Sequence, residues 1–141
     1  MATMYCEIVS AEKSLFSGDI KKLTAVGTIG GLGIHPGHTP LLTGIQPGPV
    51  TLTMENDEEE VFFASGGFIE IQGGYVTILA DTALRAEDID EAQAKEAEEA
   101  AERASSDMAA GVDFSVITAQ LAEARAQQRT IDELRKLRGR A

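Results

Sequence analysis

The sequence has little of several features that would narrow its class. Its single cysteine, Cys6, excludes both a disulfide framework and a cysteine-ligated zinc site. No apolar run approaches the ~18 residues that a membrane-spanning helix needs. Residues 1–7 have neither the basic start and apolar stretch of a signal peptide nor the arginine-rich pattern of a transit peptide. We therefore expect a soluble protein of a reducing compartment.

Basic residues are also few. The chain has 12 Lys and Arg against 23 Asp and Glu, which gives a formal net charge of −11 at pH 7. Such an excess of acid repels a phosphate backbone and excludes general nucleic-acid binding. The hydrophobic content of 43% is too high for a disordered acidic chain. The 141 residues suit one folded domain, or a domain of about 85 residues with an appendage.

Glycine and proline are nearly absent from the second part of the chain. Of the 14 glycines, 12 lie at or before Gly74, as do all four prolines. After Asp81 the helix formers Ala, Glu and Arg dominate. We place a boundary near residues 84–87, which divides the chain into a β domain, residues 1–85, and a helical unit, residues 86–141.

The first part has the patterns of short strands. Val50, Leu52 and Met54 alternate with polar residues, which is the period of a half-buried strand. Asn56-Asp57 predicts a turn and Gly73-Gly74 a tight hairpin. Further strands are expected at residues 5–10, 20–26, 61–65, 68–72 and 75–80, with residues 17–19 between strands and residues 30–33 as a tight loop. Turns this frequent predict an antiparallel sandwich or barrel rather than a parallel sheet.

The second part predicts two helices. Asp88 followed by Glu91 resembles a capping box, so the first helix is expected over residues 88–105. Asp113 or Ser115 is the predicted start of the second, which runs to about residue 137. One face of this second helix is apolar: Ile117, Leu121, Ala124, Ile131 and Leu134.

The matching stripe on the first helix is mostly alanine. It consists of Ile89, Ala92 or Gln93, Ala97, Ala100, Ala104 and Met108. Each alanine buries about one methyl group, worth ~0.8 kcal/mol, so a hairpin of this kind is marginally stable alone. Two interpretations stay open: an ordinary helical cap on the β domain, or an arm that can leave its docking surface for another partner.

The end of the chain is basic although the whole chain is acidic. Between residues 125 and 140, six Lys and Arg face only Asp132 and Glu133. Cations are favoured at helix C-termini for structural reasons. Alternatively, this basic tail suits an acidic patch on the first helix or on a partner protein.

No group of residues predicts an active site. Gly30-Gly31-Leu32-Gly33 lacks the Lys-Ser or Lys-Thr of a phosphate-binding loop. His35 and His38 lack a nearby third metal ligand, and no serine has the G-x-S-x-G frame of a hydrolase. The run of acids at residues 57–60 is most simply a solvated hairpin tip.

Several motifs together resemble one family. Residues 33–42, Gly-Ile-His-Pro-Gly-His-Thr-Pro-Leu-Leu, are similar to the G-I-x-P-G-H-x-P-L-L signature of epsilon subunits of bacterial F-type ATP synthases. The resemblance continues through residues 8–12, 16–18, 45–48, 64–71 and 76–83. It covers the whole predicted β half, and the length and two-helix tail agree with the bacterial form.

This resemblance implies a fold, a function and a location. It implies a ten-stranded β-sandwich that docks on the gamma shaft and on the loops of the membrane c-ring. The subunit would rotate with the shaft, perform no chemistry, and lie peripherally on the cytoplasmic face of the bacterial inner membrane. Its C-terminal helices would either fold against the sandwich or extend along gamma into the catalytic hexamer, where they suppress ATP hydrolysis.

The resemblance also implies partner contacts. On the c-ring side it points to Gly31, His38 and Leu42, although Gly31 stands where family members often carry an acid. On the helical arm, the contacts with gamma and with an acidic loop of beta would fall on Met108, Arg125, Arg129, Arg135 and Lys136.

A nucleotide site is the remaining implication. Many relatives bind ATP at an I/L-D-x-x-R-A motif, whose match here is Ile89, Asp90, Gln93 and Ala94. Gln93 replaces the arginine and loses its fixed cationic fork, so we predict weak or absent ATP binding and no other cofactor or metal. Two alternatives to a rotor subunit stay open: a free-standing nucleotide sensor with Asp90 and Arg85 as ligands, and a small enzyme that uses His35 and His38.

Overall fold

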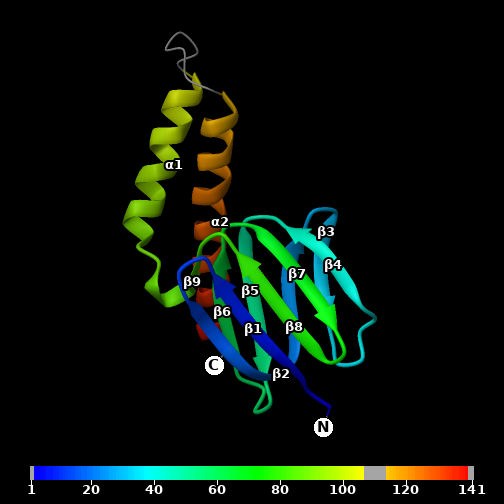
Figure 1. The fold of residues 1–141 in the computed structure, drawn as a ribbon. Helices are drawn as coiled ribbons and strands as arrows, with labels where there is room; N and C mark the ends of the chain where they lie inside the picture. Colours follow the sequence, from blue (N-terminus) through cyan, green and yellow to red (C-terminus); the bar gives the residue numbers. More distant parts are fainter. Residues whose placement is uncertain (1, 107–113, 140–141) are drawn as a thin grey trace.

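The computed structural model describes residues 2–106 and 114–139. In this part of the chain nine strands precede two α-helices, with one turn of 3-10 helix between them (Figure 1). The elements are β1 (Met4–Ser10), β2 (Ser14–Gly27), β3 (Gly30–Ile34), β4 (Leu41–Ile45), β5 (Gly48–Met54), β6 (Glu59–Ala64), β7 (Gly67–Gln72), β8 (Tyr75–Ala80), β9 (Ala83–Arg85), η1 (Ala86–Asp88), α1 (Glu91–Ser106) and α2 (Phe114–Gly139).

The strands form a sandwich of two layers, and β2 connects the layers because it pairs with strands of both. One layer has the order β1-β8-β7-β4, and the other contains β3, β2, β5, β6 and β9. The 14-residue β2 pairs with β1 in the first layer and with β3 and β5 in the second. The predicted antiparallel sandwich is confirmed, except that β1 and β8 are parallel. The structure describes nine strands where the resemblance implied ten.

Alternating apolar side chains fill the space between the layers. Cys6, Ile8, Leu23, Leu52 and Ile78 are each 0% exposed, and each lies on a strand whose neighbouring residues are less buried. This period of two is the reason that one face of each strand supplies the core.

β6 is an exception, because it is buried on both faces. Phe62 belongs to the core cluster, whereas Val61 and Phe63, also buried, lie on the other side of the strand. That side faces α2, which packs on β5 and β6. The continuous apolar run at residues 61–64 therefore reflects a strand covered by a sheet layer on one side and by a helix on the other.

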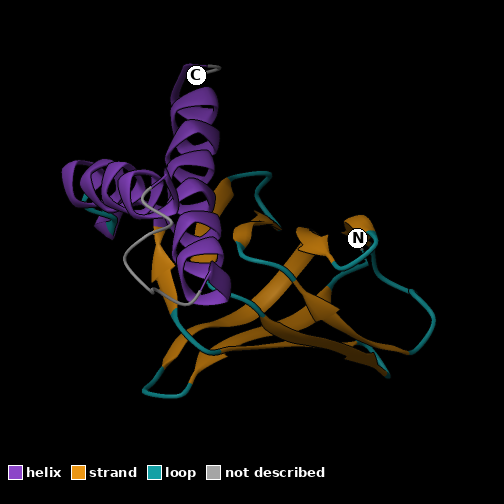
Figure 2. Cartoon of the chain, turned by 90° about the horizontal axis from the view of Figure 1, so that it is seen from above, coloured by secondary structure: helices purple, strands orange, loops and turns teal. Residues whose placement is uncertain are grey.

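The helices form a hairpin in which α2 alone is well attached to the sandwich. α1 packs against α2 and has no extensive contact with any strand in the part that the structure describes. Figures 1 and 2 show the two helices on one side of the sandwich. The predicted apolar face of α2 is confirmed: Ile117, Ala124 and Ile131 are buried, and Leu121 and Leu134 are half-buried.

Two predictions for the glycine-rich segments are wrong. Residues 17–19 do not separate strands but lie inside β2, where Gly18 pairs with Cys6. Residues 30–33 are not a loop but most of β3, which pairs with β2 beyond a turn at Thr28-Ile29. Glycine has weak strand propensity, so its pairing here is decided by the neighbouring strand and not by local preference.

The predicted start and buried face of α1 are also wrong. Asp88 ends η1, and Asp90 caps α1 instead, because the Gln93 backbone N–H donates to Asp90 Oδ1 at 3.1 Å. Ala94 and Ala101, seven residues apart, are the buried alanines of α1, whereas the predicted Ala92, Ala97 and Ala100 are exposed. α1 therefore starts later than predicted and buries different residues, but its buried residues are still alanines.

Candidate functional site

The three residues predicted for the c-ring side lie on adjacent segments and are all exposed. Gly31 lies in β3 opposite Val26, and Leu42 lies in β4 opposite Glu70 with 68% of its surface exposed. His38 lies in the loop from β3 to β4, where its Nδ1 donates to the Thr39 carbonyl oxygen at 2.7 Å.

Shallow hollows connect two of these three residues. Gly31 lines one hollow of about 270 Å³ together with Leu41 and Thr43. Leu42 lines the next hollow with Glu70, and Leu41 borders both. The fold therefore brings Gly31 and Leu42 to neighbouring parts of one surface, whereas His38 lines neither hollow.

The outward side of the β1-β8-β7-β4 layer carries exposed apolar residues that the sequence interpretation missed. Phe68 lies directly opposite Leu79, and their exposed fractions are 58% and 52%. Tyr75 pairs with Tyr5, and the two ring centroids are 5.6 Å apart in an edge arrangement. No helix covers this side in Figures 1 and 2. We call it the uncovered face and define it by Tyr5, Leu42, Phe68, Tyr75 and Leu79.

Acidic side chains interrupt the uncovered face. Glu70 lies between Leu42 and Thr77, and Glu7 lies opposite Thr77 on the other side. The surface thus combines aromatic and aliphatic groups with two carboxylates, which is a suitable chemistry for a partner surface with apolar and cationic groups.

The sequence also contains a compositional signal for this end of the sandwich, which the strand patterns do not show. Residues 23–54 contain no Asp, Glu, Lys or Arg, although a quarter of the whole chain is charged. This segment includes β3, β4 and the loop with His35 and His38. Depletion of charge is a compositional feature of the cores of protein interfaces, so it could have pointed to this end of the sandwich.

The basic residues predicted for the helical arm already have partners within the chain. Arg125 contacts Glu98 and Glu102, Arg135 pairs with Glu91, and the Lys136 ammonium lies 3.6 Å from Glu133. Arg129 Nη2 donates to the Pro47 carbonyl oxygen at 3.2 Å, from α2 to the sandwich. Met108 lies outside the described residues.

The positions that match the nucleotide motif have structural roles here. Asp90 caps α1, Ala94 is 2% exposed, Ile89 is half-buried, and Gln93 is exposed. Arg85, the other ligand considered, lies over the Phe62 ring and donates to Glu60 and to the Leu15 carbonyl oxygen. Among the described residues, both ligands considered, Asp90 and Arg85, are therefore engaged by groups of the chain itself.

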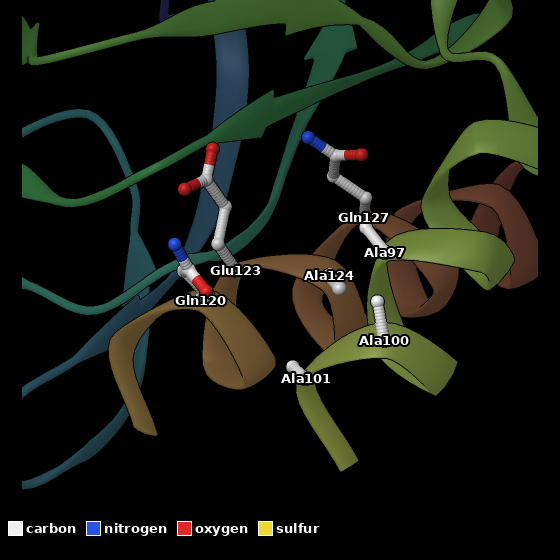
Figure 3. Close-up of a pocket in the computed structure, with 7 residues that line it drawn as sticks. All are labelled: Ala97, Ala100, Ala101, Gln120, Glu123, Ala124 and Gln127. Atoms are coloured by element: carbon white, nitrogen blue, oxygen red, sulfur yellow. The ribbon is translucent and has the colours of Figure 1, made fainter. Parts of the chain in front are cut away.

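A groove lies between the two helices (Figure 3). It has a volume of about 470 Å³, and Figure 3 shows the small alanine side chains of α1 facing α2 across it. Its lining consists of Ala97, Ala100, Ala101, Gln120, Glu123, Ala124 and Gln127. The lining contains an acid and no basic residue, so it does not suit an anionic nucleotide.

The buried thiol and the possible metal ligands of the described residues do not form a reactive site. Burial in the core, with a smaller contribution from the Glu7 charge, raises the pKa of Cys6 from 9.0 to about 12, so its thiol stays neutral and unreactive. Within residues 2–106 and 114–139, no three His, Cys, Asp or Glu side chains converge as a metal site would require. Neither helix of this described part has an apolar stretch long enough to span a bilayer.

Comparisons with known proteins agree with the fold. A chain of the Euglena gracilis mitochondrial ATP synthase structure, which contains OSCP, F1 and c-ring, has a TM-score of 0.77 at 21% identity, covering 95% of this chain and 82% of that one. A chain of the Tetrahymena thermophila mitochondrial ATP synthase central stalk and c-ring has a TM-score of 0.62 at 13% identity, covering 92% and 97%. At these identities the likeness shows the fold alone.

Sequence comparisons show the family. The family model described as the beta-sandwich domain of the ATP synthase Delta/Epsilon chain matches residues 3–86. The ATP synthase epsilon chain of Chromohalobacter salexigens is 52% identical over 136 residues, which are 96% of each chain. The chain therefore belongs to the epsilon-chain family of ATP synthases, and it is a non-catalytic subunit.

Proposed function

We propose that the chain is a central-stalk subunit of a rotary ATP synthase, which couples the catalytic head to the membrane ring. In this proposal residues 1–85 dock on the gamma shaft and on the c-ring loops, and residues 86–141 form a regulatory arm. The subunit would be held at the cytoplasmic face of the bacterial inner membrane only through the complex.

The uncovered face is the observation that carries this proposal. Four of its five residues are more than half exposed, and together they present large apolar groups on one side of the sandwich. Large exposed apolar side chains that gather on one face together with polar groups mark an interaction surface. The two carboxylates at its centre favour a partner surface that supplies cations, and we assign this face to the gamma shaft.

The c-ring contact is proposed for the end of the sandwich next to this face, at β3, β4 and the loop between them, so that Leu42 lies where the two contacts meet. Gly31 and Leu42 line adjoining hollows there, and His38 lies on the loop between their strands. Because this segment lacks carboxylates and ammonium groups, it can be desolvated against a partner at little electrostatic cost. Gly31 leaves room where a relative's acid would stand, since a Cβ at this position meets nothing within 4 Å.

The helical arm is proposed to inhibit ATP hydrolysis when it extends. α1 contacts α2 mainly through alanines and has no extensive contact with the sandwich in the described residues, so little apolar surface opposes separation of α1 from α2, whereas extension of α2 must also break its packing on β5 and β6. In the extended state Arg125, Arg129, Arg135 and Lys136 would contact an acidic loop of beta, with Met108 beside them. Shifting an even equilibrium to 99:1 needs roughly 2.7 kcal/mol of differential affinity.

ATP is proposed to be at most a weak regulatory ligand. Gln93 has no cationic fork, and Asp90 and Arg85 are engaged by the α1 backbone and by Glu60. The same contacts speak against the alternative of a free-standing nucleotide sensor.

Removal of the arm tests the inhibitory role. A chain ending at residue 85, reconstituted into the complex, should hydrolyse ATP several-fold faster with ATP synthesis intact. Because this truncation exposes the α2 side of β6, Arg129→Glu with Arg135→Glu in the full chain is the second variant, and its effect should be greatest at low salt. Unchanged hydrolysis in both variants would refute inhibition, and a salt-independent effect would refute an electrostatic contact.

A further inference from the structure

The interface between α1 and α2 contains little apolar surface. Ala94 and Ala101 are the buried side chains of α1 whose exposure the structure describes, and α1 packs against α2. Figure 3 shows that α1 contributes only alanines to the groove between the helices. Apolar contact alone therefore holds the two helices weakly, and another interaction must contribute to their alignment.

The two helices have opposite charge. α1 carries five acidic and two basic residues, a net charge of −3, whereas α2 carries three acidic and five basic residues, a net charge of +2. Helices with this asymmetry attract each other along their whole length when they lie side by side. The basic end of the chain therefore has an acidic partner surface within the same molecule.

Ion pairs join the helices at both ends of the hairpin. Near the end of α1, Arg125 Nη2 lies 3.2 Å from Glu102 Oε1, and Arg125 Nε lies 3.8 Å from Glu98 Oε1. Glu98 also accepts a hydrogen bond from Gln128. At the start of α1, Arg135 pairs with Glu91. In the described part of the chain, every ion pair between α1 and α2 is formed by an acid of α1 and an arginine of α2.

The acids of α1 already occupy donors of these arginines. Arg125 and Arg135 are among the residues that the proposed function assigns to an acidic surface of the complex. Arg125 has its Nε and Nη2 engaged by Glu98 and Glu102, so fewer of its N–H donors are left for another carboxylate. The acids of α1 therefore compete with any acidic partner for the same cations.

We propose that Glu91, Glu98 and Glu102 form an electrostatic latch that keeps the arm folded and withholds its arginines from an acidic partner. The latch follows from the geometry of the hairpin, and its regulatory consequence rests on the proposed function. The arm is released when an acidic protein surface binds the arginines more favourably than α1 does.

The latch responds to ionic strength. The side chains of Arg125 and Arg135 are 51% and 61% exposed, so water and salt reach both pairs. Exposed pairs of this kind are individually weak and are screened over a Debye length of about 8 Å at physiological salt. A few such pairs favour the closed hairpin over the open one by only a small free energy, so the binding of an acidic partner can shift this equilibrium.

Hydrogen exchange on the full-length isolated chain tests the latch. The variant Glu98→Gln with Glu102→Gln removes two charges from the latch without changing side-chain length. Glu96→Gln with Glu99→Gln is the matched control, because it removes the same charge from the same helix at two exposed positions with no ion pair among the described residues. Amides of α1, which is held mainly by its contacts with α2, report opening of the hairpin.

The latch variant should exchange roughly fivefold faster than wild type at about 20 mM salt, and this difference should shrink at about 0.5 M salt, where wild type itself becomes faster. The control should resemble wild type at both salt concentrations. Equal behaviour of the two variants, or a difference that salt does not change, would overturn the latch.

The assembled complex separates this proposal from the proposed function. Glu98→Gln with Glu102→Gln should strengthen inhibition of hydrolysis, because the released arm keeps its arginines. Arg125→Gln should weaken inhibition although it loosens the same hairpin. If both loosen the isolated hairpin but neither changes hydrolysis, the latch stands and the inhibitory function fails. If both change inhibition in the same direction, the competition for arginines is refuted.

Discussion

The fold changes the acid–base chemistry of Cys6. It is 0% exposed in β1, and burial raises its pKa from 9.0 to about 12. In the unfolded chain the thiol ionises near pH 9, whereas in the folded chain it keeps its proton to a much higher pH. The free energy of unfolding must therefore fall as the pH rises from about 9 towards 12, because the unfolded state loses the proton first.

Cys6→Ala should remove this alkaline loss of stability. At pH 7.5 the variant should be about 1–2 kcal/mol less stable, because it loses buried volume in the core. By pH 10.5 wild type should lose up to about 2 kcal/mol through Cys6, so the gap should narrow or close. Urea unfolding of both proteins at the two pH values measures the gap, and lysines and tyrosines titrate equally in both. A constant gap would contradict the prediction.

At the scale of elements, the local sequence pattern was sufficient to predict a strand or helix that has one buried face and one exposed face. The alternation at residues 50–54 and the glycine pair at residues 73–74 predicted β5 and the β7–β8 hairpin, and the period of α2 predicted its buried face. β3 and the central part of β2 were missed because glycines carry no side-chain pattern. Their strand structure depends on pairing with segments distant in sequence.

The close approach of β7 and β8 at Gly67 gives a test at this scale. Gly67 has φ +142°, and a Cβ there would lie 2.0 Å from the Leu79 carbonyl oxygen and 2.9 Å from Ala80 Cα. Both atoms are backbone, so relief requires the two strands to separate. Gly67→Ala should reduce the free energy of unfolding by about 3 kcal/mol or more.

Gly31→Ala is the matched control, because a Cβ in that part of β3 meets nothing within 4 Å. Its effect should be within about 1 kcal/mol. Chemical unfolding of both variants provides the comparison. Similar losses for the two substitutions would show that β7 and β8 do not meet as closely as described.

At the scale of the whole molecule, the two outer sides of the sandwich differ, because α2 covers one of them and the other is exposed to solvent. β6 is buried under α2, whereas β7 and β8 present Phe68, Tyr75 and Leu79 to solvent. In the sequence all of these are apolar residues in short strands and look alike. Which side α2 covers is decided by the packing of α2 on β5 and β6, so the uncovered face could not be predicted from strand patterns. Only the absence of charge from residues 23–54 pointed towards part of it.

Binding to the gamma shaft should depend on this face. Phe68→Ser with Leu79→Ser removes two paired apolar side chains that are already more than half exposed, so the free energy of unfolding should change by no more than about 1 kcal/mol. Affinity for gamma should fall at least tenfold, because large apolar groups at the centre of an interface contribute about 1–2 kcal/mol or more.

Val116→Ser is the control for this experiment, because Val116 is 49% exposed but lies on α2, away from the uncovered face. Titration calorimetry with purified gamma measures the affinity of each variant, and circular dichroism verifies that each is folded. A Phe68 and Leu79 variant that binds as tightly as Val116→Ser would show that gamma docks elsewhere. The central-stalk proposal would then lose the observation that carries it, whereas membership of the epsilon-chain family rests on sequence and would be unaffected.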